Sequence, residues 1–397
     1  PYGADSNHDL LNEIYNLSAK RLSNSYSYFI ELGLKLRNTN GCLTYIVPNT
    51  WLSIDSALKL RKELFKSNKI ENILFTHQIF QSMSDVPPVV DTVVFTAAQG
   101  EPLYELNLIE LSSDKTLNSR LKETELRSFN ELKIVEIDTL NEQNYFKVDI
   151  GASMGVPCKY FELESEFFGV RIGSQEYAVG KGKPSLSKEL IKKKIYHSET
   201  KKDNSYQPFV PCGNIQRFSF QWSGRFLKWG ENLHCPRNRD IYDCEHILVS
   251  RIYDKKKSKL KSCLVPSLNT GEFYVNNTDS FSVIKTKESK YPLKFILGLI
   301  NSEYIGKLLE AKNVNLIRKV YPKINTKDLK QIPIVEVEYE QVEKVLDLVD
   351  KIMLGDSSAI EELDLLIYNL YEVDFAVFSE KSSIKGISEE EYYSKVK

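Results

Sequence analysis

Residues 41–48 read Gly-Cys-Leu-Thr-Tyr-Ile-Val-Pro, a short apolar run with β-branched residues that lies between a glycine and a proline. This pattern is typical of a buried strand. Two further strands are predicted at residues 70–75 and 89–97, and a helix through Phe65 lies between the first two strands. Strands that alternate with helix in this way indicate an α/β layer with a mostly parallel sheet.

The segments on either side of this layer have other patterns. Residues 12–37 carry apolar residues at three- and four-residue steps, which predicts a helix. Residues 103–111 are expected to add an edge strand, and residues 113–145 look helical and polar. Residues 146–285 combine short strands, glycines and aromatic residues without a βαβ rhythm. The chain therefore changes its architecture after about residue 112.

The last third of the chain predicts helices. Residues 293–309, which follow Pro292, are apolar nearly all round and are expected to form a core helix. Residues 339–354 and 359–371 predict two amphipathic, acidic helices.

Charge is distributed very unevenly along the chain, although the formal net charge is only −1. Residues 1–180 carry 17 Lys and Arg against 24 Asp and Glu, and residues 331–397 carry 6 against 16. Residues 181–330 carry 30 against 14, a net charge of +16. Such a block indicates a domain that binds a polyanion, and the alternative is a lysine-rich solvated surface. Residues 180–205, lysine-rich and poor in apolar residues, are expected to be a mobile surface segment.

The composition excludes several classes of protein. Hydrophobic residues make up 42% of the chain, and no apolar run is long enough to span a membrane. The six cysteines are scattered, as expected for a reducing cytoplasm. The first residue is Pro1 rather than methionine, so we expect a piece of a longer protein.

The N-terminal segments occur in the order of a known enzyme domain. Pro1-Tyr2-Gly3 resembles the end of the Asn-Pro-Pro-Tyr loop of amino-methyltransferases. The region is similar to the second half of the TaqI-like, gamma-class adenine-N6 DNA methyltransferases, which also occur in type IIG restriction-modification enzymes. The other matching segments are residues 28–31, 41–48, 57–64 and 92–95 and the pair Ile79-Phe80.

This resemblance implies a catalytic role for three residues. A base inside a duplex must be flipped out before its amine can be methylated. By the resemblance, Pro1 and Tyr2 belong to the catalytic loop, Tyr2 stacks on the flipped adenine, and Phe80 is a second aromatic against it. The alternatives are that Tyr2 is only a terminal residue and Phe80 a core aromatic. The resemblance also implies that the strand at 89–97 runs antiparallel.

S-adenosylmethionine is the cofactor implied for the full-length protein. Its glycine-rich loop belongs to the first half of the domain, and Gly180-x-Gly182 lies in a lysine-rich stretch rather than at a strand–helix junction. We therefore expect no cofactor to bind to this chain.

A second resemblance covers the rest of the chain. Residues 206–217, Tyr-Gln-Pro-Phe-Val-Pro-Cys-Gly-Asn-Ile-Gln-Arg, look like the opening of the TaqI-type C-terminal specificity domain. Four short segments that follow in the right order support this: residues 297–302, 321–324, 329–333 and 362–371.

Basic residues in this module alternate with aromatic ones, a pattern that suits DNA. Arginine can read guanine edges, and lysine suits phosphates. The alternative is that the aromatics are core and about half of the cations are solvated. The candidate DNA-binding residues are Arg217, Arg225, Lys228, Arg237, Arg239, Arg251, Lys255, Lys256 and Lys257.

Two metal-dependent alternatives have weak support. His234, Cys235, Cys244 and His246 lack the spacing of a zinc site. Asp279 with Glu288-Ser-Lys290 fits a loose nuclease pattern, which a chain rich in Glu and Lys produces by chance. No metal site is therefore expected.

The sequence thus predicts a partial, Rossmann-like α/β methyltransferase sheet, an α+β target recognition domain and a C-terminal helical segment. The predicted boundaries are residues 1–112, 113–336 and 337–397. The predicted function is sequence-specific recognition of double-stranded DNA and part of the flipped-base pocket for a restriction-modification adenine-N6 methyltransferase, with no membrane or protein partner indicated. The alternative is a non-catalytic specificity subunit of a type I-like system, which has no use for the α/β half.

We predict that the 397-residue chain is catalytically silent, because the expected cofactor loop and catalytic Asn precede Pro1 in the family. Labelled S-adenosylmethionine with mixed-sequence DNA should give no methyl transfer, and calorimetry should detect no cofactor binding. Micromolar affinity for the cofactor would contradict this expectation.

Overall fold

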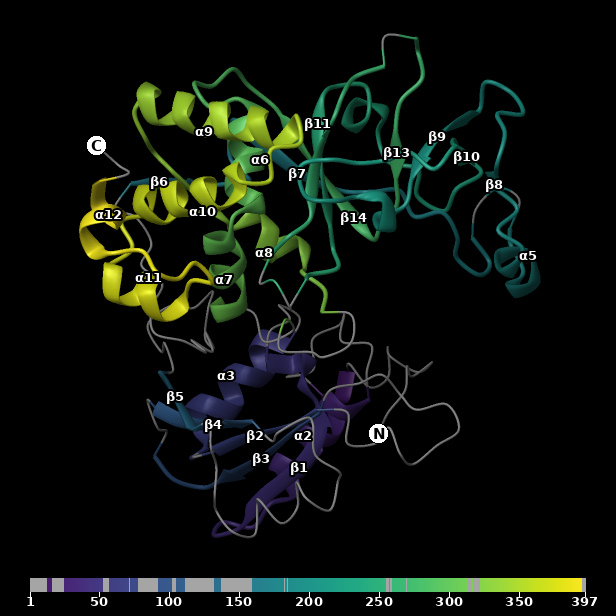
Figure 1. Ribbon diagram of the computed structural model, residues 1–397. Helices are drawn as coiled ribbons and strands as arrows, with labels where there is room; N and C mark the ends of the chain where they lie inside the picture. Colours follow the sequence, from purple (N-terminus) through teal and green to yellow (C-terminus); the bar gives the residue numbers. More distant parts are fainter. Residues whose placement is uncertain are drawn as a thin grey trace. The chain divides into compact units, whose positions relative to one another are not determined.

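The computed structural model (Figure 1) describes two compact units. Unit 1 comprises residues 1–153 and 310–320, and unit 2 comprises residues 154–309 and 321–397. The described residues are 13–15, 25–52, 57–70, 72–77, 92–101, 105–110, 132–136, 159–181, 183, 185–254, 257, 259–268, 270–312, 316 and 322–394.

The described part of unit 1 contains a five-stranded sheet in the order β1-β3-β2-β4-β5. β3 runs antiparallel to both of its neighbours, β2 and β4 are parallel, and β5 is antiparallel to β4. The antiparallel orientation predicted for residues 89–97 is therefore confirmed. The expectation of a mostly parallel sheet is wrong for the described strands, because only β2 and β4 pair in parallel. The strands are β1 Cys42–Pro48, β2 Asn72–His77, β3 Thr92–Ala98, β4 Glu105–Glu110 and β5 Leu132–Glu136.

Helices α2, Tyr26–Leu36, and α3, Leu58–Ser67, share one apolar core with the sheet. The side chain of Trp51 is fully buried at the centre of this core. Its ring packs 6.1 Å from Phe65 of α3 and 5.3 Å from Phe95 of β3, measured between centroids. The short helix η1, Asn49–Leu52, directly follows β1 and so places Trp51 between helix and sheet.

Two further expectations for unit 1 are wrong. Residues 132–136 form β5 rather than helix, and β4 is not an edge strand because it lies between β2 and β5. The sequence Leu-Lys-Ile-Val-Glu is too short to show a period-2 pattern clearly within polar surroundings. Its state is set by pairing with β4, which is a non-local contact.

Unit 2 contains short strands, as predicted for residues 146–285. One sheet, in the order β12-β11-β14-β7, is antiparallel throughout, and a second has the order β13-β9-β10-β8. β6 pairs with β15. The strands are β6 Tyr160–Glu162, β7 Phe168–Ile172, β8 His197–Ser198, β9 Tyr206–Val210, β10 Phe226–Lys228, β11 His246–Ser250, β12 Ser262–Val265, β13 Val275–Asn276, β14 Ser280–Lys285 and β15 Pro333–Val335.

The helix predicted over residues 293–309 is two helices, α6 and α7, separated by Ser302. Ser302 has extended backbone, and its hydroxyl accepts a hydrogen bond from the N–H of Ile305 at 3.2 Å. It therefore caps the second helix, as serine often does. The helices of this part are α6 Leu293–Asn301, α7 Glu303–Lys312 and α8 Thr326–Lys330.

The C-terminal segment contains the two predicted helices, α9 and α10, and two that were not predicted, α11 and α12. α9 packs against α6 and α10 (Figure 1). Gly298 of α6 allows this approach, because a Cβ there would lie 3.0 Å from methyl groups of Val345 and Val349 in α9. The helices are α9 Tyr339–Met353, α10 Ala359–Leu370, α11 Phe375–Lys381 and α12 Glu389–Ser394.

The lysine-rich segment 180–205, expected to be a mobile surface segment, is partly in regular structure among its described residues. It contains α5, Lys188–Lys192, and β8, and it buries the side chains of Leu186 and Tyr196. None of the described helices is long and apolar enough to cross a membrane.

We predict that Gly173→Ala strongly destabilises unit 2. A Cβ at this position would lie 2.3 Å from the carbonyl oxygen of Asn277 and 2.7 Å from that of Asn276, and backbone atoms cannot move aside as a side chain can. The expected loss is about 2–3 kcal/mol in the free energy of unfolding, measured by urea denaturation. Gly213→Ala is the matched control, because its Cβ would meet nothing within 4 Å. Equal stability of the two variants would contradict the close packing.

Candidate nucleic-acid interface

The predicted specificity module begins at a strand that is buried along its whole length. All five residues of β9 are buried, and Gln207 links this strand to its surroundings. The Gln207 side chain donates to the carbonyl of Asn204 at 3.0 Å and accepts from the N–H of Phe273 at 3.2 Å. The segment 206–217 therefore begins on a strand that is anchored in the core of unit 2.

Arg217, the first candidate DNA contact, points into the protein. Its Nη2 donates to the carbonyl of Asn301 at 2.8 Å. Burial lowers the pKa of Arg217, and the charges of Asp364 and Glu303 oppose that shift. The neighbouring Phe218 has a φ of +64° and donates its N–H to Ser262 at 2.8 Å, so the turn that carries Arg217 is held in a conformation uncommon for phenylalanine.

Three other candidate arginines also donate hydrogen bonds to backbone carbonyls. Arg251 donates to Thr278 at 2.9 Å. Arg237, whose φ is +68°, donates to Gly173 at 3.2 Å. Arg239 donates to Gly271 at 3.2 Å and forms an ion pair with Asp243 at 2.6 Å. These guanidinium groups join segments far apart in the sequence, so part of the basic block serves the fold itself.

The remaining candidates differ in accessibility. The side chain of Arg225 is 51% exposed and pairs with Glu199 at 3.3 Å. Arg239 is 50% exposed in spite of its contacts, Lys257 is exposed, and Lys228 is half-buried. Lys255 and Lys256 lie outside the described residues, as do the predicted catalytic residues Pro1, Tyr2 and Phe80. The DNA-binding role of the whole set stays a prediction.

The segment 297–302 has an internal role that its residues explain. Asn301 ends α6, and its side chain accepts from the N–H of Ser262 at 3.0 Å and donates to the carbonyl of Ser262 at 2.9 Å. The backbone carbonyl of Asn301 also accepts the hydrogen bond from Arg217. Asn301 thus joins α6, strand β12 and the turn that carries Arg217.

A buried ionic network attaches the C-terminal helices to this frame. Asp364 of α10 accepts from Nζ of Lys259 at 2.6 Å and from the N–H of Glu303 at 2.7 Å. Burial raises the pKa of the Asp364 carboxyl, against the opposing effect of Lys259. The carboxylate of Glu303, which is buried, accepts from the hydroxyl of Ser382 at 3.1 Å and the N–H of Ser383 at 2.8 Å.

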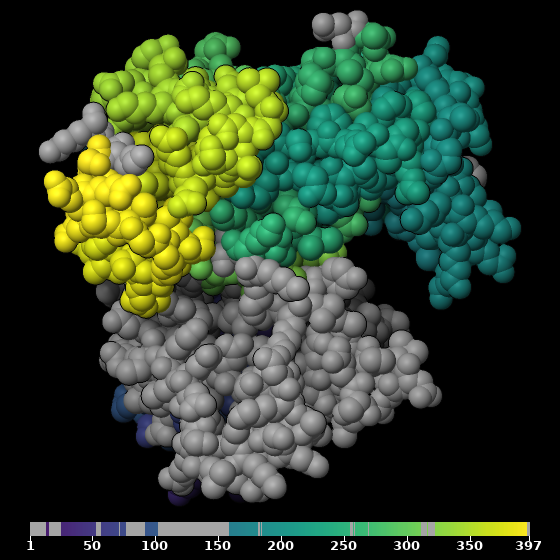
Figure 2. Space-filling model, viewed as in Figure 1, coloured from purple at the N-terminus to yellow at the C-terminus, as the bar shows by residue number. Residues whose placement is uncertain are grey.

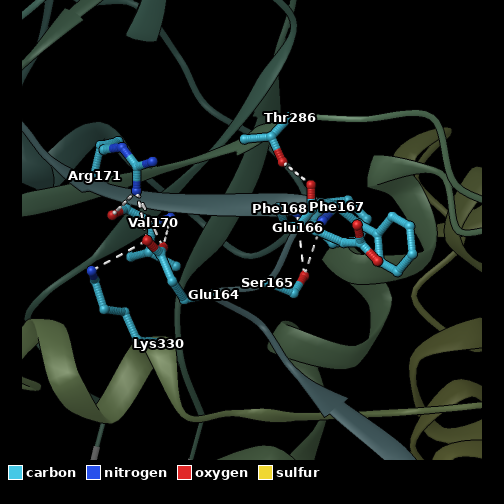
Figure 3. A network of polar contacts seen from close by, with 9 residues as sticks. All are labelled: Glu164, Ser165, Glu166, Phe167, Phe168, Val170, Arg171, Thr286 and Lys330. Atoms are coloured by element: carbon cyan, nitrogen blue, oxygen red, sulfur yellow. Dashed lines mark hydrogen bonds and ion pairs between the residues drawn. The ribbon is translucent and has the colours of Figure 1, made fainter.

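A second polar network, which sequence reasoning missed, holds α8 to the start of β7 (Figure 3). The Glu164 carboxylate accepts from the Val170 N–H and pairs with Arg171 at 2.9 Å and Lys330 at 3.3 Å. Burial acts to raise the pKa of Glu164, but the Val170 N–H, Arg171 and Lys330 together lower it. Close by, the hydroxyl of Thr286 donates to the Glu166 carbonyl at 2.6 Å. No short motif marks Glu164, because Lys330 is 166 residues away.

Among the described residues, no group of three or more His, Cys, Asp or Glu could hold a metal ion. The two metal patterns of the sequence are accounted for by other contacts. His246 is buried, with Nδ1 2.7 Å from the Cys244 carbonyl. Asp279 pairs with Lys323, and Lys290 donates to the carbonyl of Val337.

The glycine pair that was weighed for S-adenosylmethionine is described only in part. Gly180 adjoins the isolated bridge between Val179 and Leu186 in unit 2, with a φ of +70°, rather than the junction of a strand and a helix. Gly182 lies outside the described residues.

Comparison with protein families supports both resemblances. Residues 1–80 match the Eco57I restriction-modification methylase family, and residues 208–334 match the TaqI-like C-terminal specificity domain. The recognised segments at residues 28–31, 41–48, 57–64 and 79–80 fall within the first match, and those at 297–302, 321–324 and 329–333 within the second. The segments 92–95 and 362–371 lie outside both matches. No curated protein matches the sequence.

Two solved structures are similar in fold to this chain, at low sequence identity. The type IIL restriction-modification enzyme MmeI, solved in complex with DNA, matches with a TM-score of 0.57 at 11% identity, over 98% of this chain and 53% of MmeI. A nuclease-deletion mutant of the type ISP enzyme LlaGI, solved with a DNA substrate mimic, matches with a TM-score of 0.53 at 10% identity, over 89% of this chain and 34% of LlaGI. The chain thus spans about half the length of MmeI, and these likenesses show the fold alone.

We predict that Asp364→Asn destabilises unit 2 by about 3–5 kcal/mol, because it leaves the buried ammonium of Lys259 without a counter-charge. Chemical denaturation followed by tryptophan fluorescence measures the loss. The double variant Lys259→Met with Asp364→Asn removes the lone charge and keeps an acceptor for the Glu303 N–H, so it should recover most of the stability. A double variant as unstable as the single one would rule out the ion pair as the cause.

Proposed function

We propose that this chain recognises a DNA sequence for a restriction-modification methyltransferase that methylates adenine at N6. The observation that carries the proposal is the pairing, in one chain, of a methylase segment at residues 1–80 with a TaqI-like specificity domain at residues 208–334. The net charge of +16 over residues 181–330 supports a polyanion as the ligand. MmeI, a protein of similar fold, was solved in complex with DNA, which supports DNA as that polyanion.

In this proposal the chain also forms part of the pocket for the flipped base. Pro1, Tyr2 and Phe80 are the residues assigned to it, through the resemblance to adenine methyltransferases. S-adenosylmethionine is the methyl donor proposed for the whole protein. In this proposal the role assigned to this chain is recognition, and methyl transfer is the role of the whole protein.

The alternative, a non-catalytic specificity subunit, has less support. A specificity subunit does not require the α/β sheet of unit 1, and residues 1–80 match a methylase family. A methyltransferase and a specificity subunit both recognise a DNA sequence. They differ in whether a methylase domain accompanies the specificity domain.

We predict that the chain selects one short, adenine-containing motif from a library of random duplexes. Base contacts in the major groove discriminate by about 1–3 kcal/mol per base pair, which repeated rounds of binding and sequencing amplify. The same motif should carry N6-methyladenine in the genome of the source organism. A library that shows no enrichment after binding would contradict sequence recognition, and an enriched motif that is unmethylated would contradict the adenine assignment.

A further inference from the structure

We propose that residues 181–202, here called the lysine arm, contact the phosphate backbone of duplex DNA through Lys188, Lys192, Lys193 and Lys194. This inference rests on the proposed function and deepens it. It assigns to the arm a sequence-independent contact that holds the duplex on the specificity module. None of these four lysines is among the basic residues that the sequence pattern singled out.

The arm is strongly basic, and a cluster of its lysines forms no ion pair among the described contacts. It contains eight lysines and two carboxylates, Glu189 and Glu199. Glu199 pairs with Arg225, while Lys183 pairs with Glu231 and Lys201 with Glu272. Among the described contacts, no ion pair or side-chain hydrogen bond involves the ammonium groups of four exposed residues in and after α5, which are Lys188, Lys192, Lys193 and Lys194.

These four lysines come from one anchored turn of chain. Ser187 caps α5 by accepting from the N–H of Leu190, and Ile191 packs against the apolar cluster that contains Leu186 and Tyr196. Leu186 before the turn is 2% exposed, and Tyr196 after it is 5% exposed. The cationic turn is thus fixed at both ends.

A second set of contacts fixes the base of the arm, Tyr196 and His197, to the preceding residues Glu176 and Tyr177. Tyr177 stacks on Tyr196 with ring centroids 5.4 Å apart, and its hydroxyl accepts from the Tyr196 N–H at 3.1 Å. Nε2 of His197 lies 3.1 Å from the carboxylate of Glu176. A fixed base means that little conformational entropy is lost when the lysines bind a ligand.

The position of the arm leaves the lysines accessible. β8 is the edge strand of the sheet β13-β9-β10-β8, and α5 lies beyond it within unit 2 (Figure 1). In the space-filling view the teal segment that includes the arm projects from the body of unit 2 (Figure 2). An accessible group of unpaired ammonium ions suits a regular row of phosphates, which duplex DNA provides.

The division between arginine and lysine favours this assignment. Three arginines donate hydrogen bonds to backbone carbonyls, namely Arg217, Arg237 and Arg251. Among the described contacts, the side chains of the four arm lysines donate no hydrogen bond. Lysine is a compact, strongly hydrated point charge that binds phosphate without the fixed geometry needed to read a base. The arm is therefore suited to affinity and not to sequence discrimination.

The test is the salt dependence of DNA binding by the 397-residue chain. The variant K188Q/K192Q/K193Q/K194Q is compared with the wild type by fluorescence anisotropy on a random-sequence duplex. Each phosphate that the variant no longer neutralises should reduce the slope of log affinity against log salt by about 0.9, and affinity at moderate salt should fall about tenfold or more. Arginine at the same four positions retains the charge and should restore the affinity.

The matched control removes four positive charges from the acidic C-terminal segment, as K344Q/K351Q/K381Q/K385Q, and should leave the slope unchanged. As a second readout, DNA should protect the arm lysines from acetylation by an N-hydroxysuccinimide ester but not Lys344 and Lys351. The proposed role of the arm would be overturned if the arm variant bound DNA with wild-type affinity and salt slope and if DNA did not protect the arm lysines. The proposal that the chain binds DNA would stand in that case. A wild-type chain that binds no DNA even at low salt would overturn the proposed function, and the arm with it.

Discussion

The frame of unit 2 depends on one buried carboxylate, that of Asp364. It accepts from Lys259, in the loop before β12, and from the N–H of Glu303 at the start of α7. A buried charge is costly unless each of its partners stays in place. The partially positive N-terminus of a helix further favours a carboxylate at that point. Three segments distant in sequence are therefore held to one geometry.

The motifs by which the module can be recognised in the sequence converge on this place. Asn301, in the segment 297–302, joins Ser262 to Arg217, and Asp364 comes from the segment 362–371. Tyr371, from that same segment, donates its hydroxyl to the carbonyl of Pro333 at 2.6 Å. The resemblance to a specificity domain is thus carried by residues that build the frame. The resemblance therefore concerns the frame and assigns no side chain to a ligand.

Local patterns predicted the elements that local interactions determine. β1, β2 and β3 are short apolar runs, α9 and α10 are amphipathic, and all five lie close to their predicted positions. β5 and the break at Ser302 depend on a distant strand and on a single hydroxyl cap, which periodicity does not report. The roles of the arginines were hidden for the same reason. Arg217 lies 84 residues from its acceptor, and Arg251 lies 73 from Ile324 and 27 from Thr278.

The alternation of arginine with aromatic residues is therefore ambiguous in sequence for a physical reason. A guanidinium has five donors in a planar fork, so it serves equally to join two carbonyls inside a protein or to contact a guanine. Arg251 shows the first use, since Nη1 donates to Thr278 at 2.9 Å and Nε to Ile324 at 3.4 Å. Arg225 and Arg239, about half exposed, retain accessible guanidinium surface. Under the proposed function, replacing Arg225 or Arg239 is expected to change recognition and to spare the fold. Replacing Arg217 or Arg251 removes a hydrogen-bonded link between distant segments, so its effect on binding cannot be separated from its effect on the fold.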